Sequence, residues 1–413
     1  MFKKIPGTRD ILPEQVSSWQ KIEDISRRLF ALYNYTEIRP PLIEEAGLFN
    51  RSLGDAAEIV QKQMFLIQKG DDVYALRPEG TASIVRAYVE NNLDKTAGFE
   101  KFFYMGPMFR MERPQKGRLR QFHHIGCEAI GSRDPALDVE VISLSDTLLR
   151  AFSIEGYTIV LNSLGCANDR NEFGISLQQS LKSHLPALCE DCKIRFERNI
   201  MRILDCKNES CKTIVKTLSL QNAHLCNGCK QDFEQVQNGL TALGVPYEVS
   251  PYLVRGLDYY TGTVFEIKHH NLGPQQDALG AGGRYDNLVK ELGGPETGAI
   301  GFAFGMERLL LAAQNPPVRS AEKLVYIIPL GEAARQHGIT LLHNLRKNNI
   351  FADTDYENRS LKGAMRRAND LKAGFCLIIG DNELKKSTIM CKNMATGEQK
   401  EVPETELVKY LTT

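Results

Sequence analysis

Residues 110–128 read R-M-E-R-P-Q-K-G-R-L-R-Q-F-H-H-I-G-C-E and carry the most information about the fold and its chemistry. Four arginines, a lysine and two glutamates surround Phe122. Arginine offers a planar fork of donors that matches phosphate oxygens, and it stays charged at neutral pH. Pro114 and Gly117 predict an antiparallel hairpin whose loop carries Lys116 and Arg118. The stretch therefore predicts a nucleotide triphosphate site with Phe122 against the purine; a basic hairpin exposed to water is the alternative.

Five further motifs follow a fixed order along the chain. They are G-T-R-D-I-L-P from Gly7, L-R-P-E-G-T from Leu76, R-G-L-D-Y-Y-T-G from Arg255, G-G-R-Y-D from Gly282 and G-F-A-F-G-M-E-R-L from Gly301. With these motifs the chain resembles the bacterial histidyl-tRNA synthetases, which are class II aminoacyl-tRNA synthetases. The resemblance extends over essentially the whole chain and is weakest within residues 167–243.

The composition restricts the class of protein. A chain of 413 residues predicts two to three domains. Lys plus Arg and Asp plus Glu number 51 each, so the net charge is zero and only local patches can attract a polyanion. No apolar run follows Lys3 and Lys4, and no window reaches about 18 uninterrupted apolar residues. We therefore expect a cytoplasmic protein without a membrane partner, whose ten cysteines are thiols or metal ligands.

The N-terminal region combines a helix with a proline-ended strand. Apolar residues recur at helical spacing from Leu12 to Leu29, and Asn34 is a stop signal. The next segment, Y-T-E-I-R-P-P, ends in two prolines, which cannot join a central ladder, so we expect an edge or interface strand. The resemblance implies a homodimer with Pro40 and Pro41 at its interface.

Six alternating or apolar stretches predict strands of one sheet. They are Val73–Leu76, Phe102–Met105, Phe122–Ile130, Tyr157–Asn162, Val264–Ile267 and Ile300–Phe304. Their connections lack the regular strand–helix alternation of a doubly wound fold. We expect an α+β catalytic domain over residues 1–320, with an antiparallel sheet flanked by helices. The resemblance implies the same arrangement, the class II synthetase fold.

Two other regions differ in pattern. Residues 167–243 are polar, helical and rich in cysteine, which predicts a helical insertion into the catalytic domain. After a linker signal at Gln314–Pro317, strands and helices alternate. This alternation predicts a small α/β domain over residues 323–413 with a largely parallel sheet. By resemblance it is an anticodon-binding domain.

The resemblance implies ATP-dependent ligation of histidine to tRNA(His) through a histidyl-adenylate. Neither transfer needs a protein nucleophile, so positioning and charge stabilisation supply the catalysis. The implied catalytic pair is Arg110 and Arg255, on opposite sides of the α-phosphate. The implied ATP-binding residues are Arg110, Glu112, Arg118, Phe122 and Arg308, and Mg²⁺ is expected with ATP. Each arginine could instead form a salt bridge, but four in one cavity would need four carboxylate partners.

Histidine selection requires a carboxylate for the ammonium group and polar partners for the imidazole. The resemblance implies that histidine contacts Glu79, Gly80, Thr81, His124, Glu128, Arg255, Tyr259, Tyr260 and Tyr285. His124 replaces the glutamine usual in bacterial members, and an imidazole nitrogen, unlike an amide, is either donor or acceptor. Tyrosines 259 and 260, if in a strand, would face opposite sides, which favours core packing for one of them.

Cysteine spacing predicts a metal site within residues 167–243. Cys189-x-x-Cys192 and Cys226-x-x-Cys229 flank a helical segment, with Cys206 and Cys211 between them. The two C-x-x-C pairs fit one tetrahedral structural zinc, and four reduced thiols without metal are the equal alternative.

A basic group follows in the last domain. Arg359, Lys362, Arg366 and Arg367 recur near one helical face. The group predicts a tRNA contact, or a solvated face.

Two rival functions remain open at this level. One is a catalytically silent synthetase-like subunit that regulates histidine biosynthesis; such paralogues tend to erode R-G-L-D-Y-Y-T-G and to lack the last domain, and this chain keeps both. The other is a zinc-bearing nucleic-acid module, which accounts for the cysteines and for nothing else.

Overall fold

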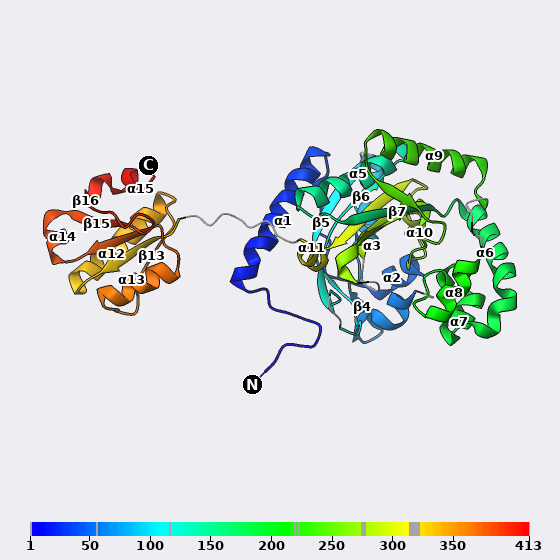
Figure 1. Ribbon diagram of the computed structural model, residues 1–413, viewed down its shortest axis with the longest axis horizontal. Helices are drawn as coiled ribbons and strands as arrows, with labels where there is room; N and C mark the ends of the chain where they lie inside the picture. Colours follow the sequence, from blue (N-terminus) through cyan, green and yellow to red (C-terminus); the bar gives the residue numbers. More distant parts are fainter. Residues whose placement is uncertain are drawn as a thin grey trace. The chain divides into compact units, whose positions relative to one another are not determined.

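The computed structural model describes residues 2–54, 57–96, 98–114, 117–218, 220, 224–273, 278–313 and 323–412. Lys116 and the linker signal at Gln314–Pro317 lie outside these residues. The chain divides into two compact units, Met1–Arg319 and Ser320–Thr413 (Figure 1).

The first unit is built on an eight-stranded sheet. In spatial order its strands are β1 (Thr36–Glu37), β5 (Glu100–Phe109), β6 (Gln121–Ile130), β11 (Ala299–Gly305), β10 (Ala278–Arg284), β9 (Thr261–His269), β7 (Tyr157–Ser163) and β8 (Tyr247–Val249). Neighbours are antiparallel except the outer pairs β1/β5 and β7/β8, whose long connections allow parallel pairing. The expected antiparallel sheet flanked by helices is confirmed, with a parallel pair at each edge.

The central hairpin follows the prediction. Strands β5 and β6 pair antiparallel from Glu100 opposite Ile130 to Phe109 opposite Gln121, and Arg110 N donates to Arg120 O at 2.9 Å. Side chains alternate along a strand, so β6 sends Ile125 and Cys127 into the main core while Phe122 and His124 line a cavity on the opposite face.

Two strand predictions need correction. The stretch Val73–Leu76 is a strand, but β4 (Asp72–Leu76) belongs to a separate three-stranded sheet with β2 (Ile43–Glu45) and β3 (Phe65–Lys69). The glycine-rich strand β10 was not predicted, because glycine carries no side chain to show an alternating pattern. Its glycines fit a crowded centre: a Cβ at Gly282 would lie 2.3 Å from Gly301 O.

Helices cover both faces of the sheet. Helices α1 (Pro13–Leu32) and α5 (Pro135–Ala151) bury Trp19, Ile22 and Val141 in the main core. As predicted, α1 ends before Asn34, which has φ +61°, and β1 lies at the sheet edge. The shorter helices of this unit are α2 (Ala46–Leu53), α3 (Thr81–Glu90), α4 (Leu93–Thr96), α10 (Leu288–Glu291) and α11 (Met306–Ala312).

In the described part of the chain, the α-helices between β7 and β8 are α6 (Ala167–Leu181), α7 (Glu190–Arg198), α8 (Glu209–Thr217) and α9 (Asn227–Ala242). Figure 1 shows them in green beside the sheet. Helix α9 packs on α5 through Phe233, Val236 and Leu240, which belong to the main core. The other three helices surround a small core of their own, which includes Phe173 and Leu177.

The second unit has a five-stranded sheet in the order β13 (Ala352–Thr354), β12 (Val325–Pro329), β14 (Phe375–Ile379), β15 (Thr388–Asn393) and β16 (Gln399–Pro403). Its first three strands are parallel, as expected from the alternation. The expectation of a largely parallel sheet is wrong for the last two strands, because β15 pairs antiparallel with both β14 and β16. A tight turn with Gly397 at φ +76° joins β15 to β16.

The helices of the second unit are α12 (Glu332–Lys347), α13 (Leu361–Asp370), α14 (Asp381–Lys386) and α15 (Leu407–Thr412). Helix α12 buries Leu341, Leu342 and Leu345 on one side of the sheet, and α13 buries Ala364 and Ala368 in a separate cluster. Across the described residues of both units, none of the helices combines the length and the apolarity that a membrane crossing needs.

Candidate active site

A cavity opens on the face of the large sheet opposite α1 and α5. It is lined by the predicted residues Glu79, Gly80, Thr81, Arg110, Glu112, Arg118, Phe122, His124, Arg255, Tyr259, Tyr260, Tyr285 and Arg308. Glu128 lies behind this lining and bonds to two members of it. Segments far apart in sequence thus converge on one cavity.

Two buried carboxylates belong to the site. Glu79 accepts hydrogen bonds from Thr81 N and Ala82 N, both at 2.8 Å, and so caps the start of α3. Glu128 accepts from Thr81 Oγ1 at 2.7 Å and from Tyr285 Oη at 2.5 Å. Gly301 permits this arrangement, because a Cβ there would lie 1.9 Å from Glu128 Oε2.

The pKa values of both carboxyl groups are raised. Burial raises the pKa of Glu79, against the lowering effect of the Ala82 and Thr81 amides and of Arg110. Burial raises the pKa of Glu128 to about 8; the Tyr285 and Thr81 hydrogen bonds oppose the shift, and nearby Glu79 adds to it. A cationic group placed between them would reverse both effects.

Four arginines line the same cavity. Arg110 Nη1 lies 3.8 Å from Glu112 Oε1, and Arg118 Nη1 lies 3.5 Å from Glu112 Oε2. Arg255 Nη1 pairs with Glu266 Oε1 at 2.5 Å. Arg308 donates to two backbone carbonyls, Gly117 O at 3.1 Å and Ala278 O at 2.6 Å.

The charges of these arginines are only partly balanced. Among the described residues, two carboxylates pair with three of the four guanidinium groups and Arg308 pairs with none, so the salt-bridge alternative balances at most half of the charge. Burial lowers the pKa of Arg308, and the neighbouring Arg118 and Arg110 lower it further. This mutual repulsion leaves the cavity suited to a polyanion.

The cavity contains two buried polar atoms without a hydrogen-bond partner among the described residues, His124 Nδ1 and Arg255 Nε. A buried polar atom left unpaired costs about 1–3 kcal/mol, so a ligand that pairs it gains affinity. Burial and the nearby Arg110 and Arg308 hold the pKa of His124 well below its usual range, so its ring is neutral.

Two of the aromatic residues do not have the local structure expected from the sequence. Tyr259 and Tyr260 lie in a turn before β9, not in a strand, so both rings line the cavity and approach within 4.7 Å between centroids. The Arg110 guanidinium lies 5.3 Å from the centroid of Phe122, which shows that this ring face accepts a planar cation in the present conformation.

Several lining residues were not predicted. Tyr104 lines the cavity from β5 and pairs in register with Gly126, and Gly280 and Ala281 come from the unpredicted strand β10. The signal for Tyr104 was its place in a predicted strand opposite a glycine. Arg284, in the motif from Gly282, does not line this cavity. Its Nη2 lies 2.7 Å from Oδ2 of the buried Asp138.

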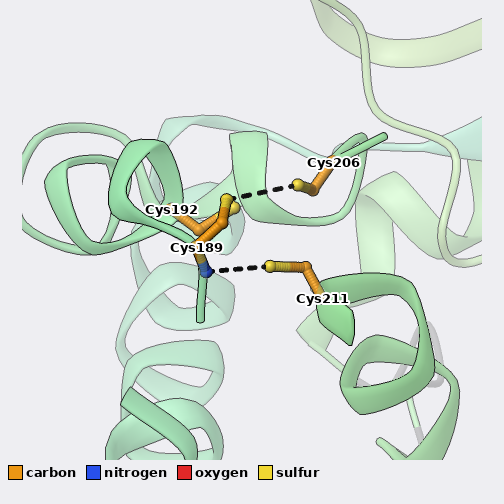
Figure 2. A group of neighbouring side chains, drawn as sticks. All are labelled: Cys189, Cys192, Cys206 and Cys211. Carbon is orange, nitrogen blue, oxygen red and sulfur yellow. Dashed lines mark hydrogen bonds between the residues drawn. The ribbon is translucent and has the colours of Figure 1, made fainter. Parts of the chain in front are cut away.

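The predicted zinc ligands do not form one site. Cys189 and Cys192 group with Cys206 and Cys211, whereas Cys226 and Cys229 group with Cys166 and Asp169 (Figure 2 shows the first group). The two C-x-x-C pairs cap different helices, α7 and α9, and this separation could not be read from the spacing.

The basic group of the second unit is also divided. Arg359 precedes α13 and pairs with Asp355 at 2.6 Å and Glu357 at 2.5 Å. Lys362, Arg366 and Arg367 are exposed on α13 and form no ion pair with the residues that the structure describes. The latter three are the cations available to a partner.

Comparisons with known proteins give a consistent result. The family model described as histidyl-tRNA synthetase matches residues 7–309, and an anticodon binding domain model matches residues 324–413. A histidine–tRNA ligase of Halothermothrix orenii is 46% identical over 98% of this chain and 97% of its own, and one of Thermosipho melanesiensis is 44% identical over 99% and 98%. The crystal structure of apo S. aureus histidyl-tRNA synthetase superposes with a TM-score of 0.82 at 37% identity, covering 100% of both chains.

Proposed function

Because the chain belongs to the histidyl-tRNA synthetase family and uses ATP to join histidine to tRNA, we propose that the large cavity is where histidine and ATP react. The observation that carries this assignment is the polarity of the cavity. Two buried carboxylates, three tyrosines and four arginines with two carboxylate partners converge on it.

Glu79, Thr81 and Glu128 hold the α-ammonium group of histidine, since the ammonium stabilises two carboxylates that burial otherwise disfavours. Tyr259, Tyr260 and Tyr285 line the side chain of the amino acid together with Gly80. The unpaired Nδ1 of His124 supplies a polar partner in place of the amide usual in bacterial relatives.

Arg110 and Arg255 bind the α-phosphate from opposite sides, while Arg118 and Arg308 bind the terminal phosphates. Phe122 and Glu112 hold the adenine. A carboxylate oxygen of histidine attacks the α-phosphorus and pyrophosphate leaves. A terminal ribose hydroxyl of tRNA then attacks the carbonyl of the adenylate, the anhydride bond breaks and AMP leaves. The arginines stabilise the charge that grows on the phosphoryl oxygens, so no side chain becomes covalently attached.

Mg²⁺ belongs to this proposal as a companion of ATP. Mg²⁺ prefers hard oxygen ligands, which the phosphate groups of ATP would supply. The ion would neutralise phosphate charge, and Glu112 keeps its proposed role beside the adenine.

We further propose a homodimer. The three-stranded sheet and the segment before it expose apolar side chains, among them Ile43 at 51% and Leu66 at 57%, next to the prolines 40 and 41. An exposed apolar surface of this kind is typical of an interface between subunits. The ten free cysteines fit a reducing compartment, the cytoplasm.

The second unit is proposed to read the tRNA through Lys362, Arg366 and Arg367 on α13. The rival role of a silent regulatory subunit is not favoured, because the ligases of known name match over nearly the full chain, including residues 324–413.

Replacement of Arg255 tests the proposed chemistry. Arg255→Ala should slow histidine-dependent exchange of pyrophosphate into ATP by about 100- to 1,000-fold, as for the loss of one oxyanion donor, with a smaller change in histidine affinity. Arg86→Ala is the matched control, because Arg86 binds Glu44 and Glu90 away from the cavity. Near-normal exchange in Arg255→Ala would remove this residue from the catalytic assignment.

A further inference from the structure

Four cysteines from three helical elements converge in the small core between β7 and β8. Cys189 precedes α7 and Cys192 lies in its first turn, Cys206 follows the 3₁₀ turn Ile200–Ile203, and Cys211 lies in the first turn of α8. Figure 2 shows the four side chains pointing toward one another. Their Sγ atoms all lie within 4.8 Å of one another, and Cys189 Sγ is 3.8 Å from Cys206 Sγ.

This geometry matches a single tetrahedral metal. Zinc–thiolate bonds of about 2.3 Å place tetrahedral sulfur ligands roughly 3.8 Å apart. Each cysteine is a free thiol. The ligands of an iron–sulfur cluster bind different irons and stand farther apart, so one ion fits better than a cluster.

Backbone donors complete the environment of the sulfur atoms. Cys189 N donates to Cys211 Sγ at 3.3 Å, and Asn208 N donates to Cys206 Sγ at 3.4 Å. Such donors orient metal ligands and stabilise thiolate charge. We propose that Cys189, Cys192, Cys206 and Cys211 bind one structural Zn²⁺.

The small core explains why a metal would be needed. Three of these cysteines, Cys192, Cys206 and Cys211, are themselves buried members of the apolar cluster that joins α6, α7 and α8. A polar segment with a core of this size gains little from apolar burial, and metal ligation adds the missing stabilisation.

The zinc site would also act on the large cavity. The 3₁₀ turn before Cys206 carries Arg202, whose Nη1 donates to Gly256 O at 2.7 Å, and Asn199 Nδ2 donates to Asp258 Oδ1 at 2.8 Å. Gly256 follows Arg255 directly, and Asp258 lies three residues after it. The metal therefore holds the turn that supports the loop of a proposed catalytic arginine, a consequence that rests on the proposed function.

The second cysteine group carries no such proposal. Asp169 already accepts from Cys166 N at 3.2 Å and Cys226 N at 3.1 Å, so it caps two helices, and Cys226 is exposed. Helix capping is sufficient to explain this group.

The test compares two double variants of the full-length chain. Elemental analysis of wild-type protein, purified under reducing conditions without added metal, should find about one zinc per chain. Cys206→Ser/Cys211→Ser should lose that zinc, and Cys226→Ser/Cys229→Ser should keep it. Co²⁺ added to metal-free, reduced wild type should give the intense absorption of a tetrahedral cobalt–thiolate site.

Each outcome decides the proposal without any activity measurement. Equal zinc in wild type and Cys206→Ser/Cys211→Ser, or loss of zinc in Cys226→Ser/Cys229→Ser with retention in the other variant, would overturn the ligand set. Wild type that contains no zinc and shows no cobalt–thiolate absorption would overturn the metal site altogether. The cobalt titration does not depend on whether a variant folds.

Discussion

At the scale of single residues, the most consequential feature is a carboxyl group that is largely protonated before substrate arrives. The pKa of Glu128 is raised from 4.5 to about 8, mainly by burial. Because the folded value lies above the unfolded one, ionisation costs stability as the pH rises from about 4.5 to about 8. At neutral pH the buried Glu128 thus lowers the stability of the ligand-free chain, a cost that the proposed binding of a cation would offset.

This feature predicts proton release on binding. At pH 7 the ammonium group of histidine should drive ionisation of Glu128, so close to one proton leaves per histidine bound. Titration calorimetry in two buffers with different heats of ionisation measures that number. Glu128→Gln keeps the shape of the side chain but cannot ionise. Any proton change of histidine itself is the same in both proteins, so the variant should release fewer protons than wild type. Identical proton counts in wild type and Glu128→Gln would rule out the assignment.

Sequence motifs predicted which side chains line the cavity better than they predicted what those side chains contact. Arg110, Phe122 and Tyr285 belong to short strings whose order is diagnostic. The pairing of Arg359 with Asp355 was not predicted, because the charge pattern of a helix says nothing about the loop that precedes it. Both adjacent tyrosines reach the cavity because a turn, and not a strand, carries them.

At the scale of elements, alternation of apolar residues predicted the hairpin β5/β6 and the strands β7, β9 and β11. It failed for β10, where glycines admit close backbone approach and leave no pattern, and for the antiparallel end of the second sheet. Cysteine spacing combined Cys189 and Cys192 with the wrong pair, since the fold, and not the sequence distance, decides which helix termini meet. Metal binding itself stays a prediction.

The contact between the 3₁₀ turn and the loop after Arg255 gives a prediction at this scale. Arg202→Ala removes the donor to Gly256 O and should lower kcat of pyrophosphate exchange about fivefold to tenfold, which corresponds to the net value of one ordinary hydrogen bond, about 1–1.4 kcal/mol. Because Arg202 is a positioning residue, KM for ATP should change less than kcat, and Arg202→Lys should restore part of the rate.

The matched control for Arg202 is Lys193→Ala, which removes an exposed ion pair with Glu190 on the neighbouring helix. It should leave exchange unchanged. Equal rates for Arg202→Ala and wild type would show that the insertion and the loop touch without any effect on the chemistry.

At the scale of the whole molecule, the two units have separate cores, and we propose a separate task for each. The first unit activates histidine and the second binds tRNA. Reversing Lys362 and Arg366 to Glu should leave exchange at the wild-type rate, because these residues lie in the second unit. Transfer of histidine to tRNA should weaken, and the salt dependence of tRNA binding should become less steep by roughly one unit per lost phosphate contact. Unchanged tRNA binding and slope would show that this helix face is only solvated.

The most direct test of the central claim is exchange of labelled pyrophosphate into ATP by the full-length chain, measured with each amino acid in turn. A site that hydrogen-bonds the side chain of its substrate often rejects analogues that leave its buried groups unpaired by about 10⁴-fold. Label should therefore enter ATP with histidine and only at a background rate with the other amino acids. Failure of histidine to support exchange, or equal exchange with another amino acid, would contradict the assignment of the cavity to histidine and ATP.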